Sequence, residues 1–164
     1  MKSRLLYFFG IVTGVYAHPT NGYLGDNGLD MDATQIDKLA YVHIENHRIL
    51  MALSHGKDLW YIPGGKREVG ESDIQALVRE IKEELDIDLI PETIAHCGTF
   101  EAPADGKPEG VTVRITCYTG DFVGKPVPKS EIEAVDFLDY AQKDKVSPAA
   151  RLVFEYLRRQ GLLK

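Results

Sequence analysis

The segment from Gly64 to Ile87 places a glycine turn and a charged loop directly before an acidic helix. Its sequence, GGKREVGESDIQALVREIKEELDI, carries Glu80, Glu83 and Glu84 within about one helical turn. Like charges three and four residues apart on a helix repel each other by roughly a few tenths of a kcal/mol per pair. A cation between the carboxylates removes that repulsion, and Mg²⁺ prefers oxygen ligands of this kind. The segment therefore predicts a divalent-metal site suited to phosphate chemistry.

The same segment predicts where the helix begins and which side it buries. Ser72 is a good N-cap, and Gln75, three residues later, completes a capping box. Apolar residues recur at helical spacing and form one stripe for the core, made of Ile74, Leu77, Val78, Ile81 and Leu85. The three glutamates centre about a third of a turn from that stripe. We therefore expect them at the edge of the buried face, where a groove can form.

An acidic helix face is most commonly a solvated face, and composition alone favours that interpretation. Two observations favour a site instead. Pro63-Gly64-Gly65 and a second glycine, Gly70, let the loop backbone approach a ligand closely. In addition, the spacing of the whole segment matches a known family motif.

The segment resembles the Nudix box. That motif runs in order through Gly, five residues of any type, Glu, seven residues of any type, Arg-Glu, an aliphatic residue, any residue, Glu-Glu, any residue, Gly and an aliphatic residue. The chain fills these positions with Gly65, Glu71, Arg79, Glu80, Ile81, Glu83, Glu84 and Ile87. The closing glycine is replaced by Asp86, a residue type that tolerates the left-handed conformation common at a helix end. The preceding residues 60–65 also look like the family's strand and turn. The chain resembles a MutT-like Nudix hydrolase.

The resemblance implies Mg²⁺-dependent hydrolysis of a phosphoanhydride bond in a nucleoside diphosphate linked to another group, with Mn²⁺ as a possible replacement. Carried over from the family, Glu83 and Glu84 would be metal ligands and catalytic residues. Glu80 would be either a third ligand or the general base. The backbone carbonyl of Gly64 is the usual main-chain ligand of this motif.

Further residues would support this site. Glu71 and Arg79 would lie behind the ligands, with Arg79 holding the carboxylates in place. Lys66 and Arg67 could contact phosphate oxygens, or could equally be solvated loop residues.

The family sometimes takes its general base from a later loop, and Glu131 and Glu133 are the candidates here. Both could also be ordinary surface acids before a strand.

The box leaves the substrate open. Pro103 lies near a position where ADP-ribose-type members often carry proline, so an ADP-ribose or nucleotide-sugar pyrophosphatase is one alternative. Another class is a Nudix-like regulatory domain that senses a nucleotide without cleaving it, although such domains often lose box glutamates and none is lost here. Four aromatic residues could stack on a base or belong to the core: Trp60, Tyr61, Phe100 and Tyr118.

Length and charge restrict the function further. The 164 residues suffice for one domain with a core, and the net charge of −6 argues against binding nucleic acid through a basic surface. We therefore expect a small nucleotide as the partner and no stable binding of nucleic acid.

Residues 1–35 read as an extension that precedes the Nudix domain at 36–164. Lys2 and Arg4 precede an apolar run that ends at Ala17, the layout of a cleaved signal peptide over residues 1–17. The run is too short to span a bilayer, and residues 18–35 read as a flexible linker. The alternatives are an extension upstream of a true start at Met31, or a buried N-terminal strand. The protein would be secreted if the signal peptide is cleaved, and otherwise cytoplasmic.

The remaining pattern predicts an α/β (α+β) fold with a mixed sheet between helices, the sandwich that the Nudix resemblance implies. The expected strands are 38–44, 47–53, 59–62, 93–102, 111–119 and 135–138. Glu45-Asn46 would turn the first hairpin, and a Pro/Gly/Asp loop the second. Ser147 and Pro148 should start a last helix that Gly161 ends.

Cys97 and Cys117 would lie directly opposite each other in the second hairpin. They would be two small buried hydrophobic residues or, in a secreted chain, a cross-strand disulfide.

Overall fold

The structure is a computed structural model, and it describes residues 34–164. The predicted signal peptide, most of the linker and the alternative start at Met31 lie outside the described residues. Among the helices of residues 34–164, none is long and apolar enough to cross a membrane.

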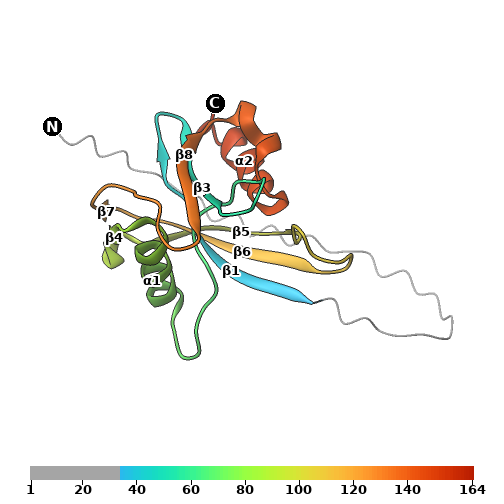
Figure 1. Ribbon diagram of the computed structural model, residues 1–164. Helices are drawn as coiled ribbons and strands as arrows, with labels where there is room; N and C mark the ends of the chain where they lie inside the picture. The colour runs from blue at the N-terminus through green and yellow to red at the C-terminus, as the bar shows by residue number, and fades with distance from the viewer. Residues whose placement is uncertain (1–33) are drawn as a thin grey trace. The chain divides into compact units, whose positions relative to one another are not determined.

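The described residues form short strands and two α-helices (Figure 1). The strands are β1 (Gln35–Tyr41), β2 (Ile44–Glu45), β3 (Arg48–Ser54), β4 (Asp88–Leu89), β5 (Ala95–Pro103), β6 (Thr112–Thr119), β7 (Phe122–Val123) and β8 (Ile132–Leu138). The α-helices are α1 (Asp73–Leu85) and α2 (Pro148–Arg159), and the 3₁₀ helices are η1 (Pro91–Thr93) and η2 (Tyr140–Lys145). β1 pairs in parallel with β6, and β6 pairs antiparallel with β5. β2, β3 and β8 form an antiparallel sheet, and β4 pairs with β7.

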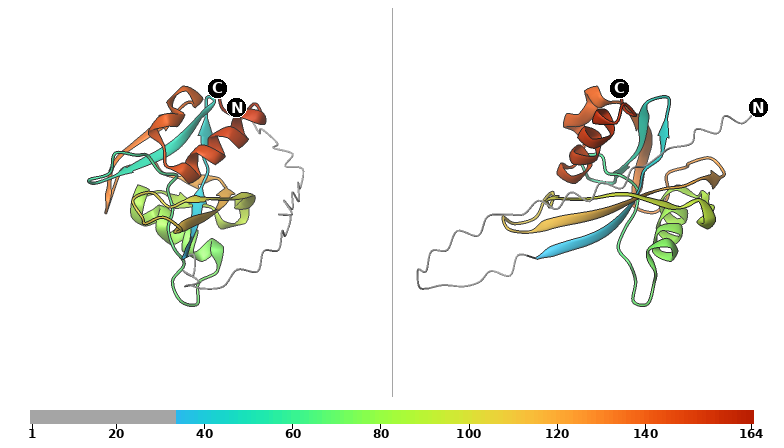
Figure 2. Two further views of the ribbon diagram at one scale, coloured as in Figure 1. Left: turned by 90° about the vertical axis from the view of Figure 1, so that its right-hand side faces the viewer. Right: turned by 180° about the vertical axis from the view of Figure 1, so that it is seen from behind.

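The two three-stranded sheets lie between the two α-helices, and β4 and β7 lie beside α1, as Figure 1 shows; Figure 2 gives two further views. Successive side chains of a strand point to opposite faces, and β1 and β3 use this alternation to bury both faces. Leu39, Tyr41 and Leu50 pack in the cluster with α1, whereas Ala40 and Met51 pack in the cluster with α2. The predicted α+β sandwich is confirmed.

The helix of the box has the predicted ends. Gln75 N–H donates to Ser72 Oγ at 3.3 Å, and Ser72 N–H donates to Gln75 Oε1 at 2.9 Å. At the other end Asp86 adopts φ 55°, a conformation that costs a residue other than glycine about 1 kcal/mol. Its carboxylate pairs with Lys129 at 2.8 Å and Lys82 at 3.4 Å. The residue that replaces the box glycine thus ties α1 to the loop before β8.

The strand predictions differ from the structure mainly in their bounds. The first hairpin turns at Asn46-His47, one residue later than predicted, and both residues have positive φ, as a two-residue hairpin turn requires. Residues 59–62 do not form a continuous strand. Tyr61 makes a single bridge to Ala52, and Trp60 makes a single bridge to Val146. β8 begins three residues early, at Ile132. β4, β7 and the 3₁₀ helices were not predicted, since elements of two to six residues are too short to carry a clear periodicity.

The prediction that the two cysteines lie directly opposite is wrong. Cys117 pairs with Gly98, because a β-bulge between His96 and Gly98 makes Cys97 the extra residue. Both cysteines are free thiols, and the Cys97 hydrogen bond and burial raise the pKa of Cys117. They belong to the cluster packed on α2.

Candidate active site

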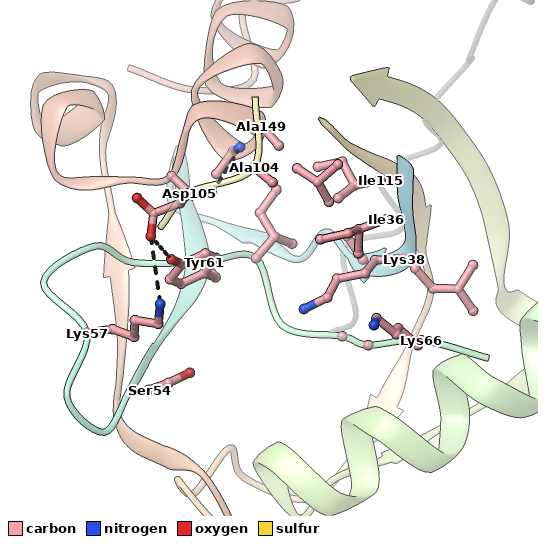
Figure 3. A pocket seen from close by; sticks show the side chains of 18 of the residues that line it. Ile36, Lys38, Ser54, Lys57, Tyr61, Lys66, Ala104, Asp105, Ile115 and Ala149 are labelled. Carbon is pink, nitrogen blue, oxygen red and sulfur yellow. Dashed lines mark hydrogen bonds and ion pairs between the residues drawn. The ribbon is translucent and has the colours of Figure 1, made fainter. Parts of the chain in front are cut away.

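A cleft of about 580 Å³ opens where the acidic helix, the glycine turn and the loop between β5 and β6 meet (Figure 3). Ten predicted site residues can be placed relative to it. Five line the cleft: Gly64, Lys66, Glu80, Glu84 and Glu131. The other five are not among the lining residues: Arg67, Glu71, Arg79, Glu83 and Glu133.

Glu84 is the most deeply placed acid of the cleft, with 6% of its surface exposed. Its Oε2 accepts a hydrogen bond of 2.8 Å from the N–H of Gly64. Burial is the main cause that raises the pKa of Glu84 to about 8; the Gly64 hydrogen bond and Lys38 oppose this, and negative Glu131 and Glu80 add to it. A solvated acidic face therefore does not describe Glu84.

Glu80 lies against the glycine turn, where a side chain would displace its carboxyl group. A Cβ on Gly65 would collide with the Glu80 carboxyl group. The Glu80 carboxylate also accepts a hydrogen bond of 2.9 Å from Arg79 Nη1. The missing side chain of Gly65 thus lets the turn and the helix carboxylate come close together.

Arg79 connects the loop of the box to the acidic helix. It donates two hydrogen bonds to Glu71, from Nε at 2.7 Å and from Nη2 at 2.8 Å. Nη2 also donates to the Lys66 carbonyl at 3.1 Å, and Nη1 lies 3.5 Å from Glu83. The Arg79 hydrogen bonds lower the pKa of Glu71 to about 2. One guanidinium group therefore fixes both the loop and the carboxylates.

The two basic residues after the glycine turn have different surroundings. Lys66 lines the cleft beside α1 (Figure 3). Arg67 instead donates to Asp73 at 2.6 Å and to Asp37 at 2.7 Å, outside the cleft. Tyr118 donates to the same Asp73 at 2.5 Å. Arg67 and Tyr118 thus join β1, α1 and β6, while Lys66 is available to a ligand.

Glu131 and Glu133 also differ. Two contacts hold the loop before β8 against α1: Lys129 N–H donates to the Glu84 carbonyl at 2.9 Å, and Ser130 Oγ donates to the Glu83 carbonyl at 3.1 Å. This attachment puts Glu131 in the cleft. Glu133 lies on the surface, 3.7 Å from His55.

Sequence reasoning missed four charged residues of the cleft: Lys38, Lys57, Asp105 and Lys107. The sequence held a sign of Lys38. Alternation along a strand puts Lys38 on the same face as Ile36 and Ala40, where a charged residue is unexpected. Lys57, Asp105 and Lys107 belong to surface loops and had no such sign. Of the four aromatic candidates, Tyr61 lines the cleft, and Phe100 packs edge-on against Tyr156 in the core.

The chain matches the family model of the NUDIX domain over residues 38–157, most of its length. It belongs to the Nudix hydrolase family. A curated 8-oxo-dGTP diphosphatase of Proteus vulgaris is 45% identical over 47 residues, which cover 26% of this chain and 42% of that protein.

Solved structures show the same Nudix fold. The E. coli ORF135 protein matches with a TM-score of 0.60 and 26% identity, over 80% of this chain and 96% of that one. A MutT NUDIX hydrolase from Burkholderia pseudomallei matches with a TM-score of 0.61 and 22% identity, over 74% of this chain and 97% of that one. The second likeness concerns the fold alone.

The oxygen donors of the Nudix cleft fit a hard divalent cation in their chemistry. Glu84 and Glu80 face the same cleft as Glu131, and their mutual repulsion is the kind that a bound cation relieves. The Gly64 carbonyl accepts no hydrogen bond from residues 34–164, whereas its neighbours Pro63 and Gly65 accept from β1. Within that same range no three acidic, His or Cys side chains form a ready metal centre, so side chains must rotate to bind one.

Glu84 should make the stability of the metal-free Nudix domain fall as pH rises. Because the pKa of Glu84 is raised from 4.5 to about 8 on folding, the folded state binds this proton more tightly than the unfolded chain. The resulting stabilisation is fully present below pH 4.5 and is lost as pH approaches 8. Its full size is on the order of 3 to 5 kcal/mol.

Urea unfolding at several pH values in EDTA, with wild type and Glu84→Gln, measures this contribution. We expect the stability difference between the two proteins to change with pH over this window. If the stabilities of the two proteins change with pH in parallel, the raised pKa of Glu84 is contradicted.

Proposed function

We propose that this protein hydrolyses a phosphoanhydride bond of a small nucleotide, with Mg²⁺ or Mn²⁺ as cofactor. One observation carries the proposal: the buried carboxyl of Glu84 lies with Glu80 and Glu131 in a cleft that lysines also line. Acids that repel each other in a desolvated place are typical of catalytic sites. The lysines supply the complementary charge for phosphate oxygens.

Glu84, Glu80 and the Gly64 carbonyl would hold the metal, with Glu83 joining them after a side-chain rotation. When bound, the metal neutralises phosphate charge and polarises the bond to be broken. The Gly64 N–H fixes the Glu84 carboxylate, since it already donates to Oε2. Arg79 keeps Glu80 near the turn, since it donates to both Glu80 and Glu71.

The residues around these acids would bind the phosphates and accept a proton. Lys38 and Lys66 lie together at the α1 end of the cleft and are suited to contact phosphate oxygens (Figure 3). Glu131 suits the general base better than Glu133, because only the former lines the cleft. The attacking water would give its proton to this carboxylate.

A substrate panel tests the proposal. We expect Mg²⁺-dependent release of phosphate or pyrophosphate, read out after a coupled phosphatase, from at least one class among nucleoside triphosphates, nucleotide sugars and ADP-ribose. EDTA should abolish it. If nucleotides bind but none is hydrolysed with Mg²⁺ or Mn²⁺, the protein is instead a nucleotide-sensing domain.

The narrower alternative is an ADP-ribose or nucleotide-sugar pyrophosphatase. Pro103, the residue that suggested it, does line the cleft. The 8-oxo-dGTP diphosphatase relative favours nucleoside triphosphates instead, but it matches over only 47 residues. The same panel separates the two, because each predicts a different preferred class.

A further inference from the structure

A second polar cluster lies in the cleft, away from the acidic helix. The Tyr61 hydroxyl donates a hydrogen bond to Oδ2 of Asp105, and Lys57 Nζ lies 3.9 Å from the same oxygen. Figure 3 shows these three side chains on the opposite side of the cleft from Lys38 and Lys66. A ligand with phosphates at the lysine end would therefore extend its other end toward Asp105.

The cluster is held in place by backbone bonds. Tyr61 exchanges two hydrogen bonds with Ala52 of β3, at 2.8 and 2.9 Å. Asp105 belongs to a turn in which Ala104 N–H donates to the Val111 carbonyl at 2.9 Å. Burial, followed by the Asp105 hydrogen bond, raises the pKa of Tyr61, so its hydroxyl stays a donor. The carboxylate is thus positioned before any ligand arrives.

Asp105 keeps accepting capacity for a ligand. The contacts with Tyr61 and Lys57 both use Oδ2, and Oδ1 accepts no hydrogen bond or ion pair from residues 34–164. Its side chain is 28% exposed and belongs to the wall of the cleft. A carboxylate can only accept, so its complement is a group with N–H or O–H donors.

Apolar side chains also line the cleft and can pack against a ring. They include Ile36, Val113, Ile115, Ala149 and Ala150. Pockets for small ligands commonly combine such walls with a few placed polar groups that decide specificity. A planar ring with N–H donors at its far edge satisfies both the wall and the carboxylate.

We propose that Asp105, fixed by Tyr61, is the specificity-determining residue for the nucleobase, and that it selects a base with an amino group next to a ring N–H. Two adjacent donors match the two oxygens of one carboxylate. A base that lacks the amino group leaves one oxygen without its partner in a partly desolvated place. The proposal rests on the proposed function, since it places a nucleotide in the cleft.

Binding of nucleoside monophosphates tests this site without hydrolysis. GMP and IMP differ only in the amino group of the base. We expect the wild type to bind GMP roughly tenfold to a hundredfold more tightly than IMP, measured by calorimetry. Asp105→Asn should reduce that ratio to nearly one, and Tyr61→Phe should reduce it in part.

Glu109→Gln is the matched control, because it removes the same charge from the same loop outside the cleft. It should leave the ratio of GMP to IMP affinity unchanged. Equal affinities in the wild type, or a preference that survives Asp105→Asn, would overturn the proposal. An equal loss of both affinities in Asp105→Asn would also overturn it, since the carboxylate would then bind the ribose.

The binding measurements do not require hydrolysis, so failure of this proposal and failure of the proposed function can be told apart. If the base preference holds but no nucleotide is hydrolysed with Mg²⁺ or Mn²⁺, only the hydrolase activity is wrong. If hydrolysis occurs without the preference, only the role of Asp105 is wrong.

Discussion

Glu84→Gln should reduce metal-dependent turnover by about a thousandfold or more. The substitution removes the charge that would hold the metal, and with the metal several kcal/mol of transition-state stabilisation is lost. Glutamine has nearly the shape of glutamate, and its amide oxygen can still accept the hydrogen bond from Gly64 N–H. The fold should therefore remain intact. Steady-state kcat with Mg²⁺ and thermal unfolding measure the two effects separately.

Glu133→Gln is the matched control for this variant. It is the same chemical change on an acid that lies outside the cleft beside His55. It should leave turnover within about twofold, because neither Glu133 nor His55 lines the cleft and surface substitutions usually change stability by only about 0.5 kcal/mol. Turnover of Glu84→Gln within tenfold of the wild type would contradict the role of Glu84.

Gly64→Ala should destabilise the protein by about 3 kcal/mol or more and remove activity with it. Gly64 has φ +138°, and a Cβ there would collide with the backbone carbonyl oxygen of Leu39. That oxygen belongs to β1, which the turn cannot leave because Leu39 N–H donates to the Gly65 carbonyl at 2.8 Å. Urea unfolding in EDTA gives the loss of stability without a contribution from metal binding.

Gly70→Ala is the control that separates the two causes of instability in Gly64→Ala, the collision of the new Cβ and the strain of a positive φ. Gly70 lies in the same loop with φ +89°, and a Cβ there has nothing within 4 Å. It should lose only about 1 kcal/mol, the cost of positive φ. If both variants lose the same stability, the contact between the turn and β1 does not explain Gly64.

The local parts of this protein could be predicted from its sequence. The capping box at Ser72, the left-handed Asp86 and the start of α2 at Ser147 depend on neighbours within about one turn. The box motif likewise led to the family and to Glu84. Such features are readable because the interactions that produce them join residues close in the chain.

The sequence of the box thus determined the acidic helix, its turn and its family. Only the tertiary structure decided which of two similar residues lines the cleft. Lys66 lines it and Arg67 does not, and Glu131 lines it and Glu133 does not. It also brought Asp105 to Tyr61 from a separate loop. The physical reason is that a cleft forms between segments distant in the chain, so the side chains that line it depend on how these segments pack and not on neighbours in the sequence.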